Sequence, residues 1–175
     1  MNKAVFWDRD GIINPVVEER EDGVKNASPQ RFEDFKLVDG AFELLNQVKA
    51  KGFLNIIVTN QPDIARNKMS WGELNKMHDF LKQGIPVIDA IYVCPHDIND
   101  NCNCRKPKPG LLLDAAKDYN INLAECYVVG DSQKDLDAAK AVGVKSILLR
   151  TDYNSEVKNA DFEVKSLQEI TKIRK

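Results

Sequence analysis

Short apolar stretches alternate along this chain with longer segments in which apolar residues recur at helical spacing. The apolar stretches are rich in valine and isoleucine and have the length of buried strands. They cover residues 4–7, 54–59, 87–94, 126–129 and 144–149. The helical spacing predicts helices over residues 41–51, 71–82, 111–119 and 136–142, three of which are closed by a glycine. This alternation predicts an α/β fold with a parallel sheet covered by helices on both faces.

Three helix starts carry a capping signal of their own, a serine followed three residues later by an acidic residue. The pairs are Ser70 with Glu73, Ser132 with Asp135, and Ser166 with Glu169. In a capping box each side chain of such a pair bonds the backbone N–H of the other residue. The last pair therefore predicts a C-terminal helix. His78, inside a predicted helix and away from any strand end, is interpreted as structural or exposed.

Length and organisation indicate one domain. A chain of 175 residues can bury one substantial core but is short for two independent enzyme domains. No internal repeat, low-complexity tract or Pro/Gly-rich linker divides it. We therefore predict a single domain over residues 1–175. Its one long irregular stretch, residues 14–35, follows the first strand and is longer than a tight connection, as lids and binding loops often are.

Composition and charge narrow the classes of function. Hydrophobic residues make up 43% and charged residues 30% of the chain, as in globular rather than disordered proteins. The 25 Lys and Arg residues balance 27 Asp and Glu residues, without a basic block for nucleic acid or anionic membranes. No apolar run approaches the roughly 20 residues of a membrane span, and no secretion signal is visible. We expect a cytoplasmic protein and, without a heptad or apolar stripe, a monomer.

Chemically useful residues follow the predicted strands, at the edge where parallel α/β sheets bind ligands. The first group is Asp8-Arg9-Asp10-Gly11. Two carboxylates two residues apart can aim one oxygen at a phosphorus atom and keep a proton donor nearby. On its own the pattern is equally an acidic, solvated turn. The polar residues that follow the remaining strands distinguish a catalytic pair of carboxylates from a solvated turn.

Two further strand ends offer groups that suit phosphate. Thr59, Asn60 and Gln61 can donate hydrogen bonds to phosphate oxygens, although helix capping also explains such residues. Beyond the third strand, two prolines stiffen the turn that carries Arg105 and Lys106. A lysine there offsets phosphoryl charge, and an arginine offers a fork for a second anionic group. A solvated basic turn is the plainer alternative.

The fourth predicted strand is followed by carboxylates that suit a divalent cation. Gly130-Asp131-Ser132 comes directly after it, and Asp135 lies three residues further on. Mg²⁺ prefers oxygen ligands and keeps several of its waters. The capping box accounts for Ser132 and Asp135 without a metal, but it leaves Asp131 unexplained.

Together these groups resemble the four motifs of the haloacid dehalogenase superfamily in order and position, over nearly the whole chain. The resemblance implies a phosphatase that forms an aspartyl phosphate on Asp8, with Asp10 as general acid and base. It implies that Thr59 and Lys106 contact the transferring phosphate. The implied Mg²⁺ ligands are Asp8, the backbone carbonyl of Asp10 and Asp131, with Asp135 in support.

A second cluster of chemically distinctive residues lies within residues 94–104. Cys94, His96, Cys102 and Cys104 supply three thiolates and one imidazole, the ligand set of a closed, tetrahedral Zn²⁺ site. Because four protein ligands leave no open position for substrate, we expect this zinc to be structural. It would fix the loop that presents Lys106.

The zinc loop, CPH-x5-CxCRKPKPG, together with DRDG and TNQ resembles one branch of the superfamily. That branch holds the D-glycero-D-manno-heptose 1,7-bisphosphate 7-phosphatases and the histidinol-phosphate phosphatases, and it lacks a large cap domain. Residues 14–35 would then be a partial cover. We favour removal of the 7-phosphate of the heptose bisphosphate, because Arg66, Arg105 and Lys108 offer cations for a second phosphate. The resemblance then places the product in heptose biosynthesis for lipopolysaccharide.

Departures from the usual heptose pattern leave alternatives open. Where those enzymes resemble QSGIARG the chain has Pro62, Asp63 and Asn67, and it has Ser132 where many carry a lysine. A different anomer, another small sugar phosphate or histidinol phosphate stays possible. A non-catalytic, zinc-stabilised module that binds a phosphometabolite is disfavoured because both motif carboxylates are retained. A dinucleotide-dependent dehydrogenase is excluded because no G-x-G-x-x-G follows the first strand.

Overall fold

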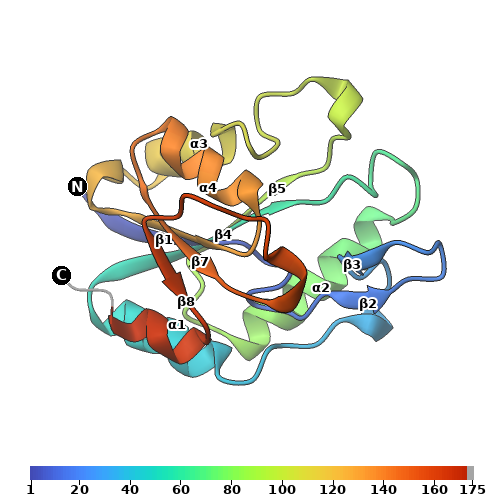
Figure 1. Ribbon diagram of the computed structural model, residues 1–175, viewed down its shortest axis with the longest axis horizontal. Coiled ribbons are helices and arrows are strands. Elements are labelled where there is room, and N and C mark those ends of the chain that lie inside the picture. The colour runs from blue at the N-terminus through green and yellow to red at the C-terminus, as the bar shows by residue number, and fades with distance from the viewer. Residues whose placement is uncertain (173–175) are drawn as a thin grey trace.

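A six-stranded parallel sheet crosses the centre of the molecule (Figure 1). The computed structural model describes residues 1–172, so residues 173–175 of the predicted domain lie outside the described residues. The strands are arranged in the order β5-β4-β1-β6-β7-β8. Their bounds are β1 Lys3–Trp7, β4 Phe53–Asn60, β5 Ala90–Cys94, β6 Tyr127–Gly130, β7 Lys145–Leu149 and β8 Phe162–Val164. The inner strand β1 pairs with both β4 and β6, so the chain that leaves its carboxyl end lies in the middle of one sheet edge.

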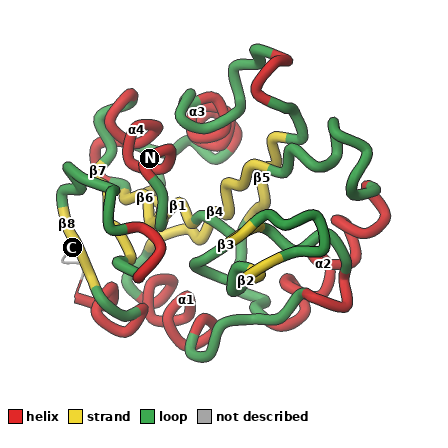
Figure 2. The backbone as a smooth tube through the Cα atoms, turned by 45° about the vertical axis from the view of Figure 1, so that its right-hand side comes forward, coloured by secondary structure: helices red, strands yellow, loops and turns green. Residues whose placement is uncertain are grey.

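Helices cover both faces of this sheet. The helices are α1 Ala41–Ala50, α2 Trp71–Gly84, α3 Gly110–Asp118 and α4 Gln133–Ala141. Figure 2 shows α1 and α2 on one side of the sheet and α3 and α4 on the other. One apolar core joins α1 and α2 to the sheet, and a second core joins α3 and α4 to its other face. The predicted three-layer α/β fold is confirmed. In the part of the chain that the structure describes, no helix has the length and apolarity needed to cross a membrane.

Every residue of the central strand β1 after Lys3 is apolar, because both faces of the strand are buried under helices. Val5 and Trp7 belong to the first core, and Ala4 and Phe6 belong to the second. All four are fully buried, as expected for a strand with helices on both faces. Burying a large apolar side chain stabilises a fold by about 1.5–3 kcal/mol. The strand end that carries the first acidic motif is therefore firmly anchored.

Element boundaries follow local signals closely. Helix α2 starts after Ser70, whose hydroxyl accepts the Glu73 N–H at 3.1 Å. Helix α4 starts at residue 133, three residues before the apolar spacing predicts, because Ser132 and Asp135 form the capping box. Up to residue 172, the last that the structure describes, only a short 3₁₀ helix, η5 Leu167–Lys172, lies where the C-terminal helix is predicted.

The long stretch over residues 14–35 is partly regular. It holds a two-stranded antiparallel hairpin of β2 Val17–Glu19 and β3 Lys25–Ala27, followed by the 3₁₀ turn η1 Phe32–Asp34. Figures 1 and 2 both show this hairpin outside the sheet and near α2. Neither it nor β8 is predicted from the sequence, because all three strands have three residues each and are mostly exposed.

Candidate active site

The turn after β1 places Asp8 at the sheet edge. The N–H groups of residues 12, 13 and 14 all donate to the Arg9 carbonyl, which closes the turn tightly. Gly11 has φ +85°, and a Cβ there would lie 2.0 Å from the Asp131 Oδ2 atom. Both the backbone angle and the close approach therefore require glycine. The glycine of the first motif is what allows the carboxylate after β6 to approach the turn after β1.

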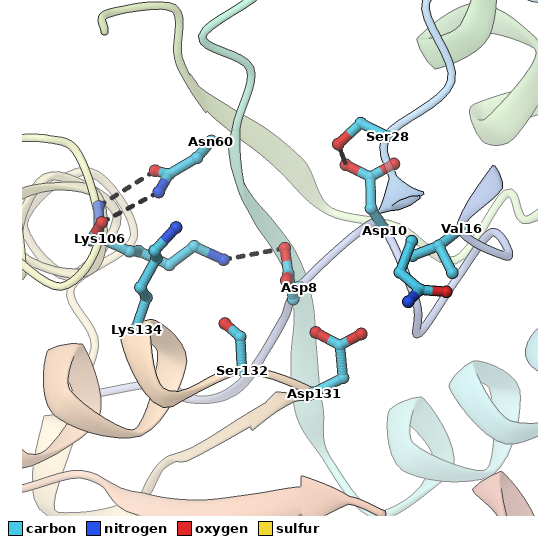
Figure 3. A pocket seen from close by; sticks show the side chains of 10 residues that line it. Asp8, Asp10, Val16, Ser28, Asn60, Lys106, Asp131, Ser132 and Lys134 are labelled. Carbon is cyan, nitrogen blue, oxygen red and sulfur yellow. Dashed lines mark hydrogen bonds and ion pairs between the residues drawn. The ribbon is translucent and has the colours of Figure 1, made fainter. Parts of the chain in front are cut away.

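Three carboxylates and one ammonium group meet at this edge. Asp8, Asp131 and Asp135 each offer one oxygen, and these atoms all lie within 4.8 Å of one another. The Lys106 Nζ lies 2.8 Å from Asp8 Oδ1 and 2.6 Å from Asp135 Oδ1, and it donates to the Val58 carbonyl at 2.9 Å. Figure 3 shows its side chain reaching Asp8. One cation thus faces three carboxylates.

The close approach of these charged groups shifts their pKa values. Burial, and then the Asp135 carboxylate, raise the pKa of Asp8 well above its ordinary value. Burial also raises the pKa of Asp131 to about 6, and Asp135 adds to the effect. Burial would lower the pKa of Lys106, but the Asp135 and Asp8 carboxylates outweigh it and raise that pKa. An oxygen-lined site with excess negative charge fits Mg²⁺, which would relieve the repulsion.

Asp10 has the opposite environment. Its Oδ1 accepts from Arg9 at 2.8 Å and from Asn14 at 3.0 Å, and its Oδ2 accepts from Ser28 and Gln61, each at 2.8 Å. Burial would raise the pKa of Asp10, but the Arg9 charge and the hydrogen bonds, Asn14 first, outweigh it and lower the pKa. Asp10 is therefore held as an ionised carboxylate, ready to accept a proton.

Arg9, between the two motif aspartates, is fully buried and was given no role from the sequence. Its Nη1 donates to the His78 Nε2 at 3.1 Å, and its guanidinium lies 5.4 Å from the centre of the Phe35 ring. Because arginine stays protonated and can only donate, His78 must accept and is neutral. His78 is thus structural, as expected, and it supports the arginine that holds Asp10.

A pocket of about 200 Å³ opens above these groups (Figure 3). Its lining residues are Asp8, Asp10, Val16, Asn26, Ser28, Asn60, Lys106, Asp131, Ser132 and Lys134. A second hollow of about 230 Å³ lies against the cysteine loop, and Arg105 and Lys108 are among its lining residues. Lys106 and Lys134 line both hollows. A ligand with two anionic ends could therefore span them.

The cysteine and histidine cluster has the shape of a zinc site. The Cys94 Sγ lies 3.6 Å from the Cys102 Sγ and 3.6 Å from the His96 Nδ1, and the Cys104 Sγ lies 3.5 Å and 3.3 Å from these two atoms. A tetrahedral zinc would separate two sulfur ligands by about 3.7–3.8 Å and a sulfur from a nitrogen by about 3.5–3.6 Å. All four cysteines of the chain are free. The donor set therefore fits Zn²⁺ with little adjustment.

Comparison with known proteins gives a consistent assignment. A family model described as HAD-hydrolase-like matches residues 103–170. The D-glycero-beta-D-manno-heptose-1,7-bisphosphate 7-phosphatase of Haemophilus ducreyi is 37% identical over 161 residues, which cover 85% of this chain and 84% of the relative. The corresponding alpha-anomer phosphatase of Campylobacter jejuni is 35% identical and covers 96% of this chain and 93% of its own. The chain belongs to the heptose bisphosphate phosphatase family. It is therefore a phosphoric monoester hydrolase of the haloacid dehalogenase type.

A solved structure supports this assignment at the level of the fold. The D,D-heptose 1,7-bisphosphate phosphatase of B. bronchiseptica, complexed with magnesium and phosphate, has a TM-score of 0.83 and 27% identity to this chain. The match covers 98% of this chain and 96% of the other. Magnesium is thus present in a relative from the heptose bisphosphate phosphatase family, as the oxygen cluster of this chain would suggest.

Several predicted phosphate ligands have other partners in this structure. The Asn60 side chain donates to the Lys106 carbonyl and accepts from its N–H, both at 3.0 Å. Gln61 Nε2 donates to Thr59 Oγ1 at 2.8 Å as well as to Asp10, and Thr59 is fully buried. These side chains position Lys106 and Asp10 here, and their predicted phosphate contacts stay predictions.

The cations expected for a second phosphate differ in how freely they can act. Arg66 pairs with Asp97 at 2.6 Å and lines neither hollow. Arg105 lines the second hollow and donates to the His96 carbonyl at 3.1 Å, and Lys108 bonds the Asn101 side chain there. Arg66 is thus drawn away from the site predicted for it.

Sequence reasoning missed further residues of the site. Tyr153 donates to the Asp131 Oδ2 at 2.5 Å, and Asn154 donates to the Asp131 carbonyl at 2.8 Å. Ser28 reaches Asp10 from the hairpin region, and Lys134 lies at the rim where the two hollows meet. For Lys134 a signal existed, since it is a basic residue in the first turn of α4, two residues beyond Ser132. The others depend on long-range folding.

Proposed function

We propose that the protein removes the 7-phosphate of D-glycero-D-manno-heptose 1,7-bisphosphate through a phosphoryl group carried on Asp8. The observation that carries the proposal is the position of the Asp8 carboxylate in a pocket, beside the Lys106 ammonium and two further carboxylates. Two relatives that bear this activity in their names, aligned over 85% and 96% of this chain, support it. Members of this superfamily that act as phosphatases use Mg²⁺.

The first half of the reaction transfers the phosphoryl group to the protein. Asp8 Oδ1 accepts from Lys106 Nζ and from the Arg9 N–H, each at 2.8 Å, so Oδ2 is the oxygen suited to attack phosphorus. As the Oδ2–P bond forms, the bond from phosphorus to the sugar oxygen breaks, and that oxygen takes a proton from Asp10. The Lys106 charge offsets the negative charge on the phosphoryl oxygens.

The second half releases inorganic phosphate. Asp10 takes a proton from a water molecule, the water oxygen attacks phosphorus, and the Asp8–P bond breaks. The lowered pKa of Asp10 keeps the carboxylate ionised, and therefore able to accept a proton at this step. In the first half of the reaction, the negative charge of the arriving substrate would raise that pKa, so that Asp10 carries a proton. Asp8, the Asp10 carbonyl and Asp131 would hold Mg²⁺, which neutralises phosphoryl charge when it is bound.

The second hollow supports a bisphosphate as substrate. A 1,7-bisphosphate has its two phosphates at opposite ends of the sugar, so the phosphate that stays must bind away from Asp8. Arg105, Lys108 and Lys134 bring three cations to the hollow beside the first pocket. Histidinol phosphate instead carries an ammonium group, which these cations would repel. We propose that zinc at the four-ligand site keeps this cationic loop in place.

Phosphate release from the purified protein with Mg²⁺ tests the proposal. The substrates are both anomers of the heptose bisphosphate, histidinol phosphate and common hexose phosphates. We expect the heptose bisphosphate to be the best substrate and to yield a heptose 1-phosphate by ³¹P NMR. Preference for histidinol phosphate would overturn the substrate assignment. Failure to hydrolyse any of these compounds would favour the non-catalytic module.

Replacement of the nucleophile is the matched test of the mechanism. Asp8→Asn removes the attacking carboxylate but nearly preserves its shape, so we expect turnover to fall below detection while the circular dichroism spectrum and zinc content stay the same. Undiminished turnover in this variant would eliminate Asp8 as the phosphoryl acceptor.

A further inference from the structure

One buried carboxylate ties the hairpin to the segment after β4. Asp63 is only 5% exposed, and its carbonyl accepts the N–H groups of Lys68 and Met69 at 2.9 and 3.1 Å. Its backbone is therefore held inside a compact turn of its own segment. The side chain, in contrast, points to residues more than thirty positions earlier in the chain.

The Asp63 carboxylate binds both flanks of the hairpin. Its Oδ2 accepts from Arg20 Nη1 at 2.6 Å and from Gln30 Nε2 at 2.9 Å, and its Oδ1 accepts from Arg66 at 3.4 Å. Arg20 directly follows β2, and Gln30 lies three residues beyond the end of β3. A short ion pair with a nearly buried arginine, completed by an amide, compensates the desolvation of the carboxylate. Both ends of the hairpin are therefore fastened at one point.

From this point a continuous chain of hydrogen bonds leads to the active site. The same Arg20 Nη1 donates to the Ser28 carbonyl at 3.2 Å, and the Ser28 hydroxyl donates to the Asp10 Oδ2 at 2.8 Å. Ser28 lines the pocket, together with Asn26 and Val16 from the hairpin region, but Asp63 does not. Asp63 can therefore influence the reacting groups only through other residues.

We propose that Asp63 is a positioning residue for phosphoryl transfer, which fixes the hairpin over the Asp8 pocket and holds the Ser28 hydroxyl on Asp10. The inference rests on the proposed phosphatase function. Asp63 is one of the residues at which this chain differs from the usual QSGIARG pattern of the heptose enzymes. The proposal gives its negative charge a role, which is to hold the β2–β3 hairpin in place. A domain without a large cap gains in this way a rigid wall on one side of its pocket.

A second ion pair of Arg20, with Asp22, provides a matched control for the Asp63 variant. Arg20 Nη2 also pairs with Asp22 at 3.1 Å, and Lys68 pairs with the same carboxylate at 2.9 Å. This side chain is 26% exposed, and partly exposed ion pairs contribute little. Asp22→Ala therefore removes an ion pair of the same arginine without removing the buried anchor.

The experiment compares Asp63→Ala, Ser28→Ala, the double variant and Asp22→Ala with the wild-type protein. For the heptose bisphosphate we expect kcat to fall about tenfold to a hundredfold in Asp63→Ala, because small displacements of catalytic groups have effects of this size. Asp63 is proposed to act on Asp10 through Ser28, so that loss of both residues removes the same effect. The kcat of the double variant should therefore be no lower than that of the slower single variant. Asp22→Ala should keep a kcat close to that of the wild type.

Limited trypsin digestion reports on the hairpin independently of turnover. We expect faster cleavage after Arg20 and Lys25 in Asp63→Ala than in Asp22→Ala, while circular dichroism shows that the domain stays folded. If Asp63→Ala does not fold, Asp63→Asn keeps an oxygen acceptor and should give an intermediate kcat. A wild-type kcat in the Asp63 variant, or effects of Asp63 and Ser28 that multiply in the double variant, would overturn the proposal. A wild-type protein inactive on every ester would instead overturn the proposed function, while the digestion still decides whether Asp63 fixes the hairpin.

Discussion

Asp8 and Asp10 show how position sets the chemistry of identical side chains two residues apart. Asp8 is surrounded by other carboxylates, and burial raises its pKa. The Arg9 charge and the hydrogen bonds from Asn14, Arg9 and Ser28 lower the pKa of Asp10 against the effect of burial, and Gln61 also donates to its carboxylate. The first carboxylate therefore depends on cations to stay ionised, whereas the second is an ionised proton acceptor before any ligand arrives.

The residue-scale prediction concerns Lys134. It lines both hollows, and we expect its ammonium to bind the phosphate that stays on the sugar. Lys134→Ala should raise the KM for the heptose bisphosphate about tenfold, the size of a lost hydrogen bond between charged groups. Its KM for a sugar monophosphate should not change. Steady-state kinetics with both substrates make the comparison.

A lysine elsewhere on the same helix serves as the control for this prediction. Lys140 is exposed near the end of α4 and lines neither hollow. Lys140→Ala should behave as the wild-type protein with both substrates. An equal rise in KM for the monophosphate and the bisphosphate in Lys134→Ala would show that this lysine does not distinguish the second phosphate.

At the scale of elements, the loop between β5 and α3 depends on its cysteine and histidine cluster. This loop has one short 3₁₀ turn, η2 Ile98–Asp100, and within residues 1–172 its remaining residues have no strand partner. Gly110 closes it against the backbone, because a Cβ there would lie 2.3 Å from the Asn103 carbonyl oxygen. The loop leads directly into Lys106, so its order bears on the position of the catalytic ammonium.

We predict that the protein contains roughly one zinc per chain and that its removal by a chelator lowers both the melting temperature and kcat. Cys102→Ser should reproduce the loss, because it removes one ligand. Cys126→Ser is the control: Cys126 is buried directly before β6 and lies outside the cluster, and its Sγ accepts from the Ala4 N–H and donates to the Asn122 carbonyl. Metal analysis and thermal unfolding measure the outcome. A zinc-free protein with full kcat would refute the role of the loop.

At the scale of the whole molecule, His78 joins α2 to the turn after β1. Burial, and then the Arg9 charge, lower the pKa of His78 to about 3. In the unfolded chain this pKa is about 6.5, so below that pH the unfolded state binds more protons. The contribution of His78 to stability is therefore complete above about pH 7 and is lost as the pH falls toward 3.

Comparison with His78→Gln isolates this effect. Glutamine can accept from Arg9 but cannot be protonated, and all other titrating groups are common to the two proteins. The free energy of unfolding of the wild type, relative to the variant, should decrease by roughly 3 kcal/mol between pH 7 and pH 4. Urea unfolding at several pH values measures it. Parallel curves for the two proteins would mean that His78 does not titrate as its environment implies.

Much of the architecture was open to prediction because the relevant signals are local. Apolar runs and helical spacing located five of the six strands of the main sheet and the four α-helices. The strand β8 was missed because its three residues are largely exposed and belong to a sheet only through their pairing with β7. Likewise, residues 14–35 carry no sequence pattern typical of a hairpin, because its two strands have only three residues each.

The kind of chemistry can be predicted from the amino-acid sequence alone, because the carboxyl ends of parallel strands meet at one edge and their polar residues then share one site. Asp8, Lys106 and Asp131 could be grouped for that reason, and the zinc ligands could be grouped because they are neighbours in the chain. The contacts that hold these side chains in place become visible only in the folded protein. The contact of Arg9 with His78 joins residues 69 positions apart in the chain. The ion pair of Arg20 with Asp63, which fastens the hairpin, joins residues 43 positions apart. Such contacts depend on side-chain directions that are set when helices and loops pack on the sheet, and no local pattern encodes them.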